Sequence, residues 1–438
     1  MDVTNLILYL KSQITSNSID QQMVSKAIRL LELGAVFTAQ SFAALPSPVG
    51  RSGELWLVLL DGLYFSTGEL WIPMAQTSFG VIWSWGSNST GALGDNTVTN
   101  RSSPVSVVGS ITDWCQISMG AFNNAAALRT NATAWSWGAN SNGQLGDNTV
   151  TNRSSPVSVV GGFTDWCQVS GGTAHTIARR SNGSAWAWGR NNYGQLGNNT
   201  TTDRSSPVSV VGGFFDWCQV STGGNHNVAV RTSGSAWLWG RNNNGQLGDN
   251  TTTNRSSPVS VLGGFSDWCQ ASTGGLHSAA VRTGGSLWSW GTNYAGHLGD
   301  STITNRSSPV SVVGGFSDWC QASAGANHSL ARRTGGSAWA WGTNTCGKLG
   351  DNTTNNRSSP VSVVGGFTDW CQVSAGASSA ALRTNGTLWA WGCASFGTLG
   401  DNSNIAKSSP VSVVGSFTDW CQVSHGLASM IALRSKTL

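Results

Sequence analysis

Charged side chains and long apolar stretches are both scarce in this sequence. Only 10% of its 438 residues are Asp, Glu, Lys or Arg, whereas globular chains average about 25%. No apolar run approaches the roughly 18 residues of a membrane-spanning helix, and the N-terminus, MDVTNLILYLKSQ, has no basic region before its short apolar run. We therefore expect neither a transmembrane segment nor a secretory signal. The 23 tryptophans argue against disorder.

Carboxylates are also few and regularly placed. No glutamate occurs among residues 81–438, and every aspartate there except Asp203 either precedes Trp or follows Leu-Gly. A glycoside hydrolase needs two carboxyl groups in different environments, whereas repeated aspartates have equivalent environments. We therefore expect a non-enzymatic protein with no catalytic residue, a carbohydrate-active enzyme being the weakest alternative. The absence of CxxC spacing predicts no metal site, and no cofactor is expected.

Clustered basic residues, which a nucleic-acid groove requires, are missing. Residues 81–438 carry 20 basic and 14 acidic side chains, spread along the chain, so we expect no nucleic-acid partner. One basic residue precedes each Ser-Ser-Pro segment, and we expect it to pair with the nearby Leu-Gly-Asp carboxylate; a ring that binds an anionic ligand is the alternative. These residues are Arg101, Arg153, Arg204, Arg255, Arg306, Arg357 and Lys407.

What the sequence does contain is a repeat. The strings DWCQ, WxWG and SSPV each occur seven times, and successive copies lie 50 to 52 residues apart. Each unit holds four short runs of β-type residues separated by turn residues, which is the signature of a propeller blade. No helical periodicity occurs within a unit. The sequence therefore predicts an all-β fold, a seven-bladed β-propeller over residues 81–438.

The two ends of the repeat array predict how the propeller closes. The first unit starts at WxWG with no ALRT-type strand before it, and the last unit ends at an IALRS strand with no WxWG after it. In a closed ring, Ile431–Arg434 would pair with Val81–Trp85 inside one blade built from both ends of the array. Closure removes the exposed strand edges that invite aggregation.

The repeat resembles that of the RCC1 family. The likeness is carried by the string WGRNNNGQLG at 239–248, the Pro-Val segment after it and the string GGLHS at 274–278. It implies a seven-bladed propeller and leaves function open, since the family includes a nucleotide-exchange factor, a UV-B photoreceptor and many adaptors. Photoreceptor members carry Gly-Trp-Arg-His-Thr where this chain has Thr173 and Ala174 before His175, and no inserted wedge of the exchange-factor kind interrupts the blades. We therefore expect neither activity.

Tryptophan and cysteine follow the repeat. Of the 23 tryptophans, 21 occupy the WxWG and DW positions, and we expect them to pack between blades rather than to form an exposed sugar-binding ladder. The DWCQ cysteines of neighbouring blades would lie about 10 Å apart, too far for disulfides, so we expect buried, unpaired thiols. Cys346 and Cys393 stand near successive WG turns and can pair, but unpaired thiols are the expectation there as well.

One repeat position holds histidine in four successive units and Asn or Ser in three others. Because each of these side chains can hydrogen-bond a turn, we expect a structural role for the position. The residues aligned there are His175, His226, His277, His328, Asn123, Ser379 and Ser429.

The loop after each WxWG differs most from repeat to repeat, and binding residues are disproportionately found on such loops. Its amides, hydroxyls and few aromatic rings suit contact with carbohydrate or another polar surface. The candidate rim-binding residues are Tyr193, Asn244, Tyr294, Phe396, Arg190 and Arg241.

Residues 1–80 differ from the repeats in composition. A helix is predicted over Ser18–Leu33, capped by Ser18 and ended by Gly34, as part of a helical anchor in residues 1–40. Two GELW strings predict a β-meander at roughly residues 51–75, within a linker of residues 41–80. This segment resembles modules of tailed-phage fibre and virion proteins. The candidate anchor residues are Ile19, Met23, Ala27, Leu30, Leu31, Trp56 and Trp71.

These observations together predict a non-enzymatic adhesion or display protein of a phage particle, located on the virion. Residues 1–80 would bind other virion proteins and allow homo-oligomers, while the propeller rim would contact polysaccharide or protein on the host surface. The alternative is a cellular RCC1-like scaffold that binds protein partners in the cytoplasm. Neither interpretation involves nucleic acid or insertion into a membrane.

Overall fold

The computed structural model describes residues 36–39, 55–58, 62–66, 71–73 and 80–435. The chain divides into two compact units, one of residues 1–78 with 130–132 and one of residues 79–129 with 133–438. In the described part of the chain, no helix is long and apolar enough to cross a membrane.

The first unit contains a small four-stranded sheet. Its strands are β1 (Val36–Ala39), β2 (Leu55–Val58), β3 (Gly62–Ser66) and β4 (Trp71–Pro73). Strands β2, β3 and β4 form an antiparallel meander, and β1 pairs in parallel with β2, a pairing that the sequence did not predict. Trp56 lies in β2 and Trp71 in β4. The predicted helix falls outside the described residues, and with it Ile19, Met23, Ala27, Leu30 and Leu31.

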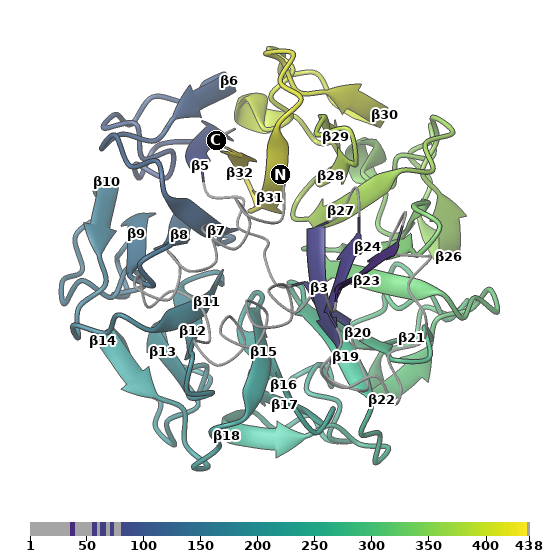
Figure 1. Cartoon of the computed structure of the whole chain (residues 1–438). Helices are drawn as coiled ribbons and strands as arrows, with labels where there is room; N and C mark the ends of the chain where they lie inside the picture. The colour runs from purple at the N-terminus through teal and green to yellow at the C-terminus, as the bar shows by residue number, and fades with distance from the viewer. Residues whose placement is uncertain (1–35, 40–54, 59–61, 67–70, 74–79, 436–438) are drawn as a thin grey trace. The chain divides into compact units, whose positions relative to one another are not determined.

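The second unit is a ring of seven four-stranded antiparallel blades (Figure 1). The first strand of each blade begins at the Trp of DWCQ and lies nearest the axis, and the fourth strand, which contains Ser-Ser-Pro, lies at the periphery. Six blades consist of consecutive strands, and these strands are β7 (Trp114–Met119), β8 (Asn124–Arg129), β9 (Ala134–Gly138) and β10 (Arg153–Ser158); β11 (Trp166–Gly171), β12 (His175–Arg180), β13 (Ala185–Gly189) and β14 (Arg204–Ser209); β15 (Trp217–Thr222), β16 (His226–Arg231), β17 (Ala236–Gly240) and β18 (Arg255–Ser260); β19 (Trp268–Thr273), β20 (His277–Arg282), β21 (Leu287–Gly291) and β22 (Arg306–Ser311); β23 (Trp319–Ala324), β24 (His328–Arg333), β25 (Ala338–Gly342) and β26 (Arg357–Ser362); β27 (Trp370–Ala375), β28 (Ser379–Arg383), β29 (Leu388–Gly392) and β30 (Lys407–Ser412). Two short 3-10 turns, η2 (Thr345–Gly347) and η3 (Ser395–Gly397), interrupt the loops after β25 and β29.

The seventh blade joins the two ends of the array. Its strands are β31 (Trp420–His425), β32 (Ser429–Ser435), β5 (Gly80–Gly86) and β6 (Arg101–Ser106). Strand β32 pairs antiparallel with β5, with Ile431 opposite Ser84 and Arg434 opposite Val81. The predicted seven-bladed fold and its closure by strands from both ends are therefore confirmed.

Tryptophan packs the blades against one another, as predicted. The second Trp of WxWG, for example Trp188, is fully buried, and its indole Nε1 donates to the carbonyl of Gln144 in the preceding repeat at 3.0 Å. Trp166, from a DW pair, contacts Trp188 with ring centroids 6.0 Å apart. Both rings belong to a cluster that includes Leu128 of the adjacent blade. Buried aromatic rings dominate the energetics of such interfaces, which accounts for the repetition of these positions.

Glutamine of DWCQ links each blade to the next near the axis. The Gln168 side chain donates from Nε2 to the carbonyl of Val220 at 3.1 Å and accepts from the Val220 N–H at 2.9 Å. Gln422 makes the same link between the last blade and the first: it donates to the Cys115 carbonyl at 2.8 Å and accepts from the Ile117 N–H at 3.3 Å. An amide side chain is required here, since only it satisfies a donor and an acceptor of the next blade together.

The DWCQ cysteines correct one expectation, because they are not buried. Four of the seven are exposed and three are partly exposed. The cause is a β-bulge: the pairing of β11 with β12 shifts between Trp166 and Gln168, and Cys167 between them is left outside the packed layer. Its thiol donates to the carbonyl of Arg179 at 3.4 Å.

Candidate functional site

The two faces of the propeller differ in how much their loops vary between blades. One face, termed the variable face, carries the loops that follow WxWG, such as residues 190–203, and the short loops between first and second strands, such as residues 172–174. The WxWG loops change from RNNYGQLGNN in one repeat to TNTCGKLGDN in another. The opposite face carries the hairpins between second and third strands, which the seventh blade lacks, and the GGF-type segments; these differ at fewer positions from repeat to repeat, with Phe215 and Leu262 among the exceptions. Residues that differ between blades are therefore more frequent on the variable face.

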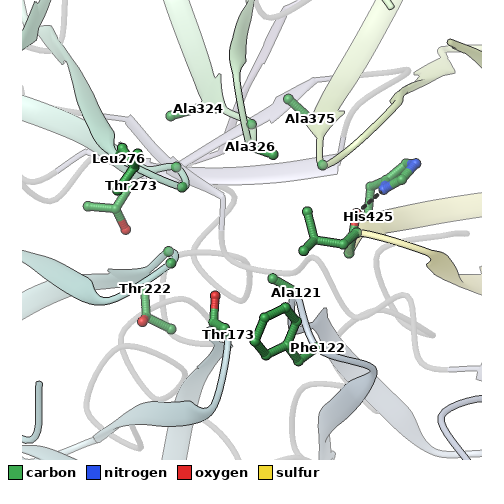
Figure 2. A pocket seen from close by; sticks show the side chains of 18 of the residues that line it. Ala121, Phe122, Thr173, Thr222, Thr273, Leu276, Ala324, Ala326, Ala375 and His425 are labelled. Carbon is green, nitrogen blue, oxygen red and sulfur yellow. Dashed lines mark hydrogen bonds between the residues drawn. The ribbon is translucent and has the colours of Figure 1, made fainter. Parts of the chain in front are cut away.

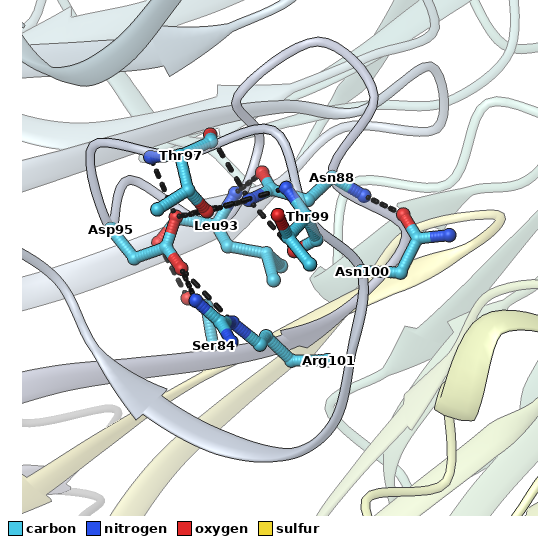
Figure 3. A network of polar contacts seen from close by, with 8 residues as sticks. All are labelled: Ser84, Asn88, Leu93, Asp95, Thr97, Thr99, Asn100 and Arg101. Atoms are coloured by element: carbon cyan, nitrogen blue, oxygen red, sulfur yellow. Dashed lines mark hydrogen bonds and ion pairs between the residues drawn. The ribbon is translucent and has the colours of Figure 1, made fainter.

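Many side chains of each WxWG loop form hydrogen bonds within the same loop. In the loop after β5, the Asn88 amide donates to the Asp95 carboxylate at 3.0 Å and its oxygen accepts from the Leu93 N–H at 2.9 Å (Figure 3). Thr97 donates its hydroxyl to Asp95 at 2.7 Å, and Arg101 lies 3.2 Å from the same carboxylate. Burial raises the pKa of Asp95, but hydrogen bonds from Thr97 and Asn88 outweigh burial and lower the pKa below its usual value. These loop residues are scaffold.

The basic residue before Ser-Ser-Pro pairs with the Leu-Gly-Asp carboxylate in six of the seven repeats, as predicted. Arg153, for example, lies 2.9 Å from Asp147. The remaining repeat departs from the pattern because Asn198 replaces the aspartate. Its basic residue, Arg204, is exposed, whereas the other six are partly buried.

The repeated histidines form buried links between blades. His226 Nε2 lies 2.9 Å from the Ser278 hydroxyl, and His277 Nε2 lies 2.9 Å from the Ser329 hydroxyl. Burial lowers the pKa of His175 to about 4 and that of His226 to about 3, so both rings are neutral at pH 7. Among the described residues, no group of three His, Cys, Asp or Glu is arranged to hold a metal ion. This position is part of the scaffold.

Strand pairing corrects the alignment of the histidine position in two repeats. His175 pairs with Gly189, and the residue that pairs with the equivalent Gly138 is Asn124, not Asn123. In the blade β27–β30, Ser379 pairs with Trp391, as Thr176 pairs with Trp188. The residue at the histidine position of that blade is therefore Ser378. Ser429 pairs with Gly86, as aligned.

The shift arises from the lengths of the short loops. The Gly172 N–H bonds the carbonyl of His175, whereas the equivalent Gly120 N–H bonds that of Asn124, one residue further along. The blade β7–β10 therefore has one extra residue in this loop, and Phe122, which is 53% exposed, lies within it.

A cavity of about 360 Å³ opens on the axis of the ring (Figure 2). The short loops of all seven blades line it. Main-chain hydrogen bonds run from loop to loop around it, from the Thr173 N–H to the Gly223 carbonyl at 3.1 Å, for example, and the Leu427 N–H completes the circle at the Ala121 carbonyl. A Cβ built on Gly223 would lie 2.1 Å from the carbonyl oxygen of Gly274, so this position requires glycine. Phe122 lies at the edge of the cavity.

Three of the six candidate rim residues lie together. The Cζ atom of Arg190 lies 5.8 Å from the centroid of the Tyr193 ring, and that of Arg241, from the next blade, lies 5.4 Å from it. Asn244 lies in the same loop as Arg241, where its N–H donates to Gln246 at 2.9 Å, whereas Tyr294 and Phe396 lie on other blades of the same face and are 58% and 52% exposed.

Cys346 and Cys393 form a disulfide, so the expectation of two unpaired thiols is wrong. Their Cα atoms are 4.9 Å apart. The spacing of about 10 Å between sheets separates equivalent residues of neighbouring blades, but these two are not equivalent: Cys346 is the fourth residue after its WxWG and Cys393 is the first. These two positions meet across adjacent loops, and Tyr193 and Arg241 occupy them in another pair of blades.

Lys348 is a buried amine without a counter-ion. The residue is 6% exposed, and within the described residues its side chain forms no ion pair or hydrogen bond, although its carbonyl accepts from the Ser379 hydroxyl at 2.7 Å. Burial lowers its pKa. The same repeat position holds Gln195 in another blade, where the side-chain oxygen accepts from the Tyr193 N–H at 2.7 Å. Lysine at this position therefore costs stability that glutamine would not.

We predict that Lys348→Gln raises the free energy of unfolding at pH 7 by about 1 kcal/mol, because a buried polar group without a partner is replaced by one that can bond. Because the pKa of Lys348 is lowered in the folded protein, the unfolded chain binds more protons between the folded and unfolded pKa values. Wild-type stability therefore rises with pH in this range, and the stability gained by Lys348→Gln shrinks toward pH 10. Urea unfolding at both pH values measures this. Gln195→Lys is the matched control, expected to destabilise; a Lys348→Gln variant less stable than wild type at pH 7 contradicts the account.

A family model described as the regulator of chromosome condensation (RCC1) repeat matches the chain seven times. The matched segments are residues 80–127, 131–179, 182–230, 233–281, 284–332, 335–382 and 385–433. Among curated proteins, the chain is 30% identical over 301 residues to the ultraviolet-B receptor UVR8 of Arabidopsis thaliana, which covers 66% of this chain and 67% of the receptor. It is 28% identical over 268 residues to the human E3 ubiquitin-protein ligase HERC2, but this covers only 6% of the ligase.

Solved structures match the propeller as a fold. Human WBSCR16 superimposes with a TM-score of 0.73 at 22% identity, over 82% of this chain and 99% of that one. Yeast RCC1 (Prp20), in its complex with Kap60, gives a TM-score of 0.73 at 19% identity, over 83% of this chain and 91% of that one. At these identities the likeness concerns architecture alone.

Proposed function

The chain belongs to the RCC1-repeat family, and on this premise we propose that it is a non-enzymatic scaffold that binds a protein partner through the variable face of its propeller. The observation that carries the proposal is that sequence differences between blades are more frequent on the variable face than on the opposite face. The segments of the opposite face differ at fewer positions, Phe215 and Leu262 being exposed exceptions, while the lengthened loop that contains Phe122 and the exposed Tyr294 and Phe396 all belong to the variable face. A surface that differs from blade to blade can recognise one partner in one orientation.

Relatives support a protein as the class of partner. Yeast RCC1 is described in complex with Kap60, and Prp20p of Saccharomyces cerevisiae is described with binding properties to Gsp1p and histones. We extend to this chain only the class of partner, a protein. The ligase activity of HERC2 is not extended, because the likeness covers 6% of that protein. Photoreception is not extended either, because Thr173 and Ala174 stand where photoreceptor members carry Trp and Arg.

The virion interpretation receives no support from these relatives, which are cellular RCC1-type proteins. It rests on the likeness of residues 1–80 to phage modules. A cellular scaffold is the better-supported of the two functions that the sequence suggested, and virion attachment and host polysaccharide are not proposed further.

Two exposed phenylalanines on opposite faces allow a matched test. Phe122 lies on the variable face and is 53% exposed, and Phe215, on the opposite face, is 68% exposed. Each is replaced by the photo-crosslinker benzoylphenylalanine in the full chain, which is then illuminated in extract of the source cells. We expect a discrete cross-linked protein with the probe at Phe122 and none with the probe at Phe215. Cross-linking from Phe215 alone, or from neither position, would overturn the proposal.

A further inference from the structure

We propose that Arg190 and Arg241, which flank Tyr193, form together with Arg204 an anion-binding patch on the variable face that takes an acidic segment of the partner protein. The proposal rests on the scaffold function above and names the chemistry that its partner must present. The patch lies where the blades β11–β14 and β15–β18 meet (Figure 1).

The first observation is that one repeat has lost its own ion pair. Asn198 stands where the other six repeats have an aspartate, so Arg204 lacks the Leu-Gly-Asp carboxylate that pairs with its counterparts, and it is exposed. Asp203, its neighbour in sequence, is engaged elsewhere: its carboxylate accepts from the Asn191 N–H at 2.8 Å and from the Asn142 amide at 3.1 Å. Within the described residues Arg204 forms no ion pair, and its charge is available to a ligand.

The second observation is the clamp around Tyr193. Arg190 and Arg241 approach the ring at 5.8 and 5.4 Å and come from adjacent blades. An aromatic ring that holds a guanidinium leaves its N–H fork free for a carboxylate or phosphate and reduces the side-chain entropy lost on binding. Burial is the main cause of the lowered pKa of His175 and of His226. The positive charge of Arg190 lowers the pKa of His175 further, and that of Arg241 does the same for His226. No carboxylate of the described residues pairs with either cation.

The third observation places the three cations near one another. Arg204 opens β14, and its Cα is the register partner of Gly189, the residue that directly precedes Arg190. Arg241 approaches Arg190 through the shared Tyr193 ring. Arg190 and Arg241 therefore occupy one blade junction, and Arg204 begins the strand that pairs with the one leading to Arg190. Position 198 is neutral there, and the Asp203 carboxylate is held by Asn191 and Asn142. Such a cluster favours bidentate recognition of carboxylate or phosphate groups.

The size of the patch favours a peptide over a nucleic acid. Tight binding to DNA or RNA neutralises a long series of phosphates, which needs basic side chains along a continuous track. In the other WxWG loops the basic residue is paired with its own aspartate, as in Arg153–Asp147 and Arg255–Asp249. The other cations without a carboxylate partner do not extend this cluster into a track, because Lys348 is largely buried and Arg179 and Arg332 bond main-chain carbonyls. The clustered charge therefore matches a short acidic segment.

The test measures the affinity of the full chain for fluorescent peptides by anisotropy. The probes are a glutamate-rich peptide, a phosphoserine peptide, a lysine-rich peptide and a single-stranded DNA. We expect the two acidic peptides to bind and the lysine-rich peptide not to bind; the stronger of the acidic two identifies the anion. Arg190→Gln with Arg241→Gln should weaken binding at least about tenfold, as loss of two charge-assisted contacts does.

Two further variants separate the patch from general charge. Asn198→Asp restores the missing carboxylate of the repeat and should weaken binding by pairing with Arg204. Arg179→Gln with Arg332→Gln removes the same charge from side chains that bond the carbonyls of Trp217 and Trp370, and should leave binding unchanged. Equal effects of the two double variants, or tighter binding of DNA than of either acidic peptide, overturn the proposal. If Phe122 still cross-links a protein in the Arg190/Arg241 variant, the patch fails and the scaffold function stands.

Discussion

Lowering the pH from 7 to about 4.5 is expected to unfold the protein, because histidines that are neutral in the folded state take up protons in the unfolded chain. The pKa is lowered to about 4 for His175 and to about 3 for His226, and it is lowered well below 6.5 for His277 and His328. Between the unfolded and folded values the unfolded chain binds more protons, so stability falls as the pH falls through this window. Each histidine contributes up to about 1.4 kcal/mol per pH unit, against a total stability of about 5–15 kcal/mol.

Urea unfolding between pH 7.5 and 4.5 tests this expectation. The matched variant is His226→Asn, because Asn124 occupies the same position in the blade β7–β10. It should reduce the slope of stability against pH by up to about 1.4 kcal/mol per unit, whereas replacing the exposed Phe215 should not change the slope. A wild-type protein equally stable at pH 4.5 and pH 7 would show that these imidazoles accept protons without unfolding, contrary to the account.

Deleting residues 429–438 is expected to abolish the folded ring. Strand β32 pairs with β31 on one side and β5 on the other. Its Met430 and Ala432 belong to one hydrophobic cluster and its Ile431 and Leu433 to another, all four fully buried. Losing large core side chains costs about 2–5 kcal/mol each, and the deletion also leaves two unpaired strand edges. The total matches the whole stability of a typical domain, about 5–15 kcal/mol.

The control for this deletion is removal of residues 436–438 alone, which leaves β32 (Ser429–Ser435) intact. Circular dichroism melting should show the cooperative transition in the control and not in the longer deletion. Leu433→Ala, expected to lower stability by about 2–5 kcal/mol, keeps the claim measurable if the longer deletion is insoluble. An unchanged melting curve after deletion of 429–438 would mean that the ring does not depend on closure by its own ends.

The repeat made the fold predictable, because every blade presents the same strand, turn and packing residues. The DWCQ string predicted the packing role of Trp166, but it did not predict the β-bulge that exposes Cys167. The extra loop residue near Phe122 did have a sequence signal. Asp113 and Asp165 are 52 residues apart, one more than Asp165 and Asp216. The alignment of Asn123 overlooked this signal.

The candidate site was predictable only in part, because its contacts join different repeat positions in adjacent loops. Tyr193 and Arg241, like Cys346 and Cys393, meet because the fourth residue of one loop reaches the first of the next. Sequence spacing alone does not reveal such a contact. Arg204 was grouped with its paired counterparts although Asn198 already showed that its carboxylate was missing. Departures from the repeat, more than its shared residues, mark the candidate site.

Amide hydrogen exchange of the full chain, with and without the protein that cross-links at Phe122, tests the central claim most directly. The account predicts that the partner slows exchange in the loops of the variable face, residues 172–174, 190–204 and 241–245. The segments of the opposite face, residues 211–216 and 262–267, should exchange at the same rate with and without it. Slower exchange confined to those segments, or no change on either face, would contradict the claim that this propeller binds its partner through the variable face.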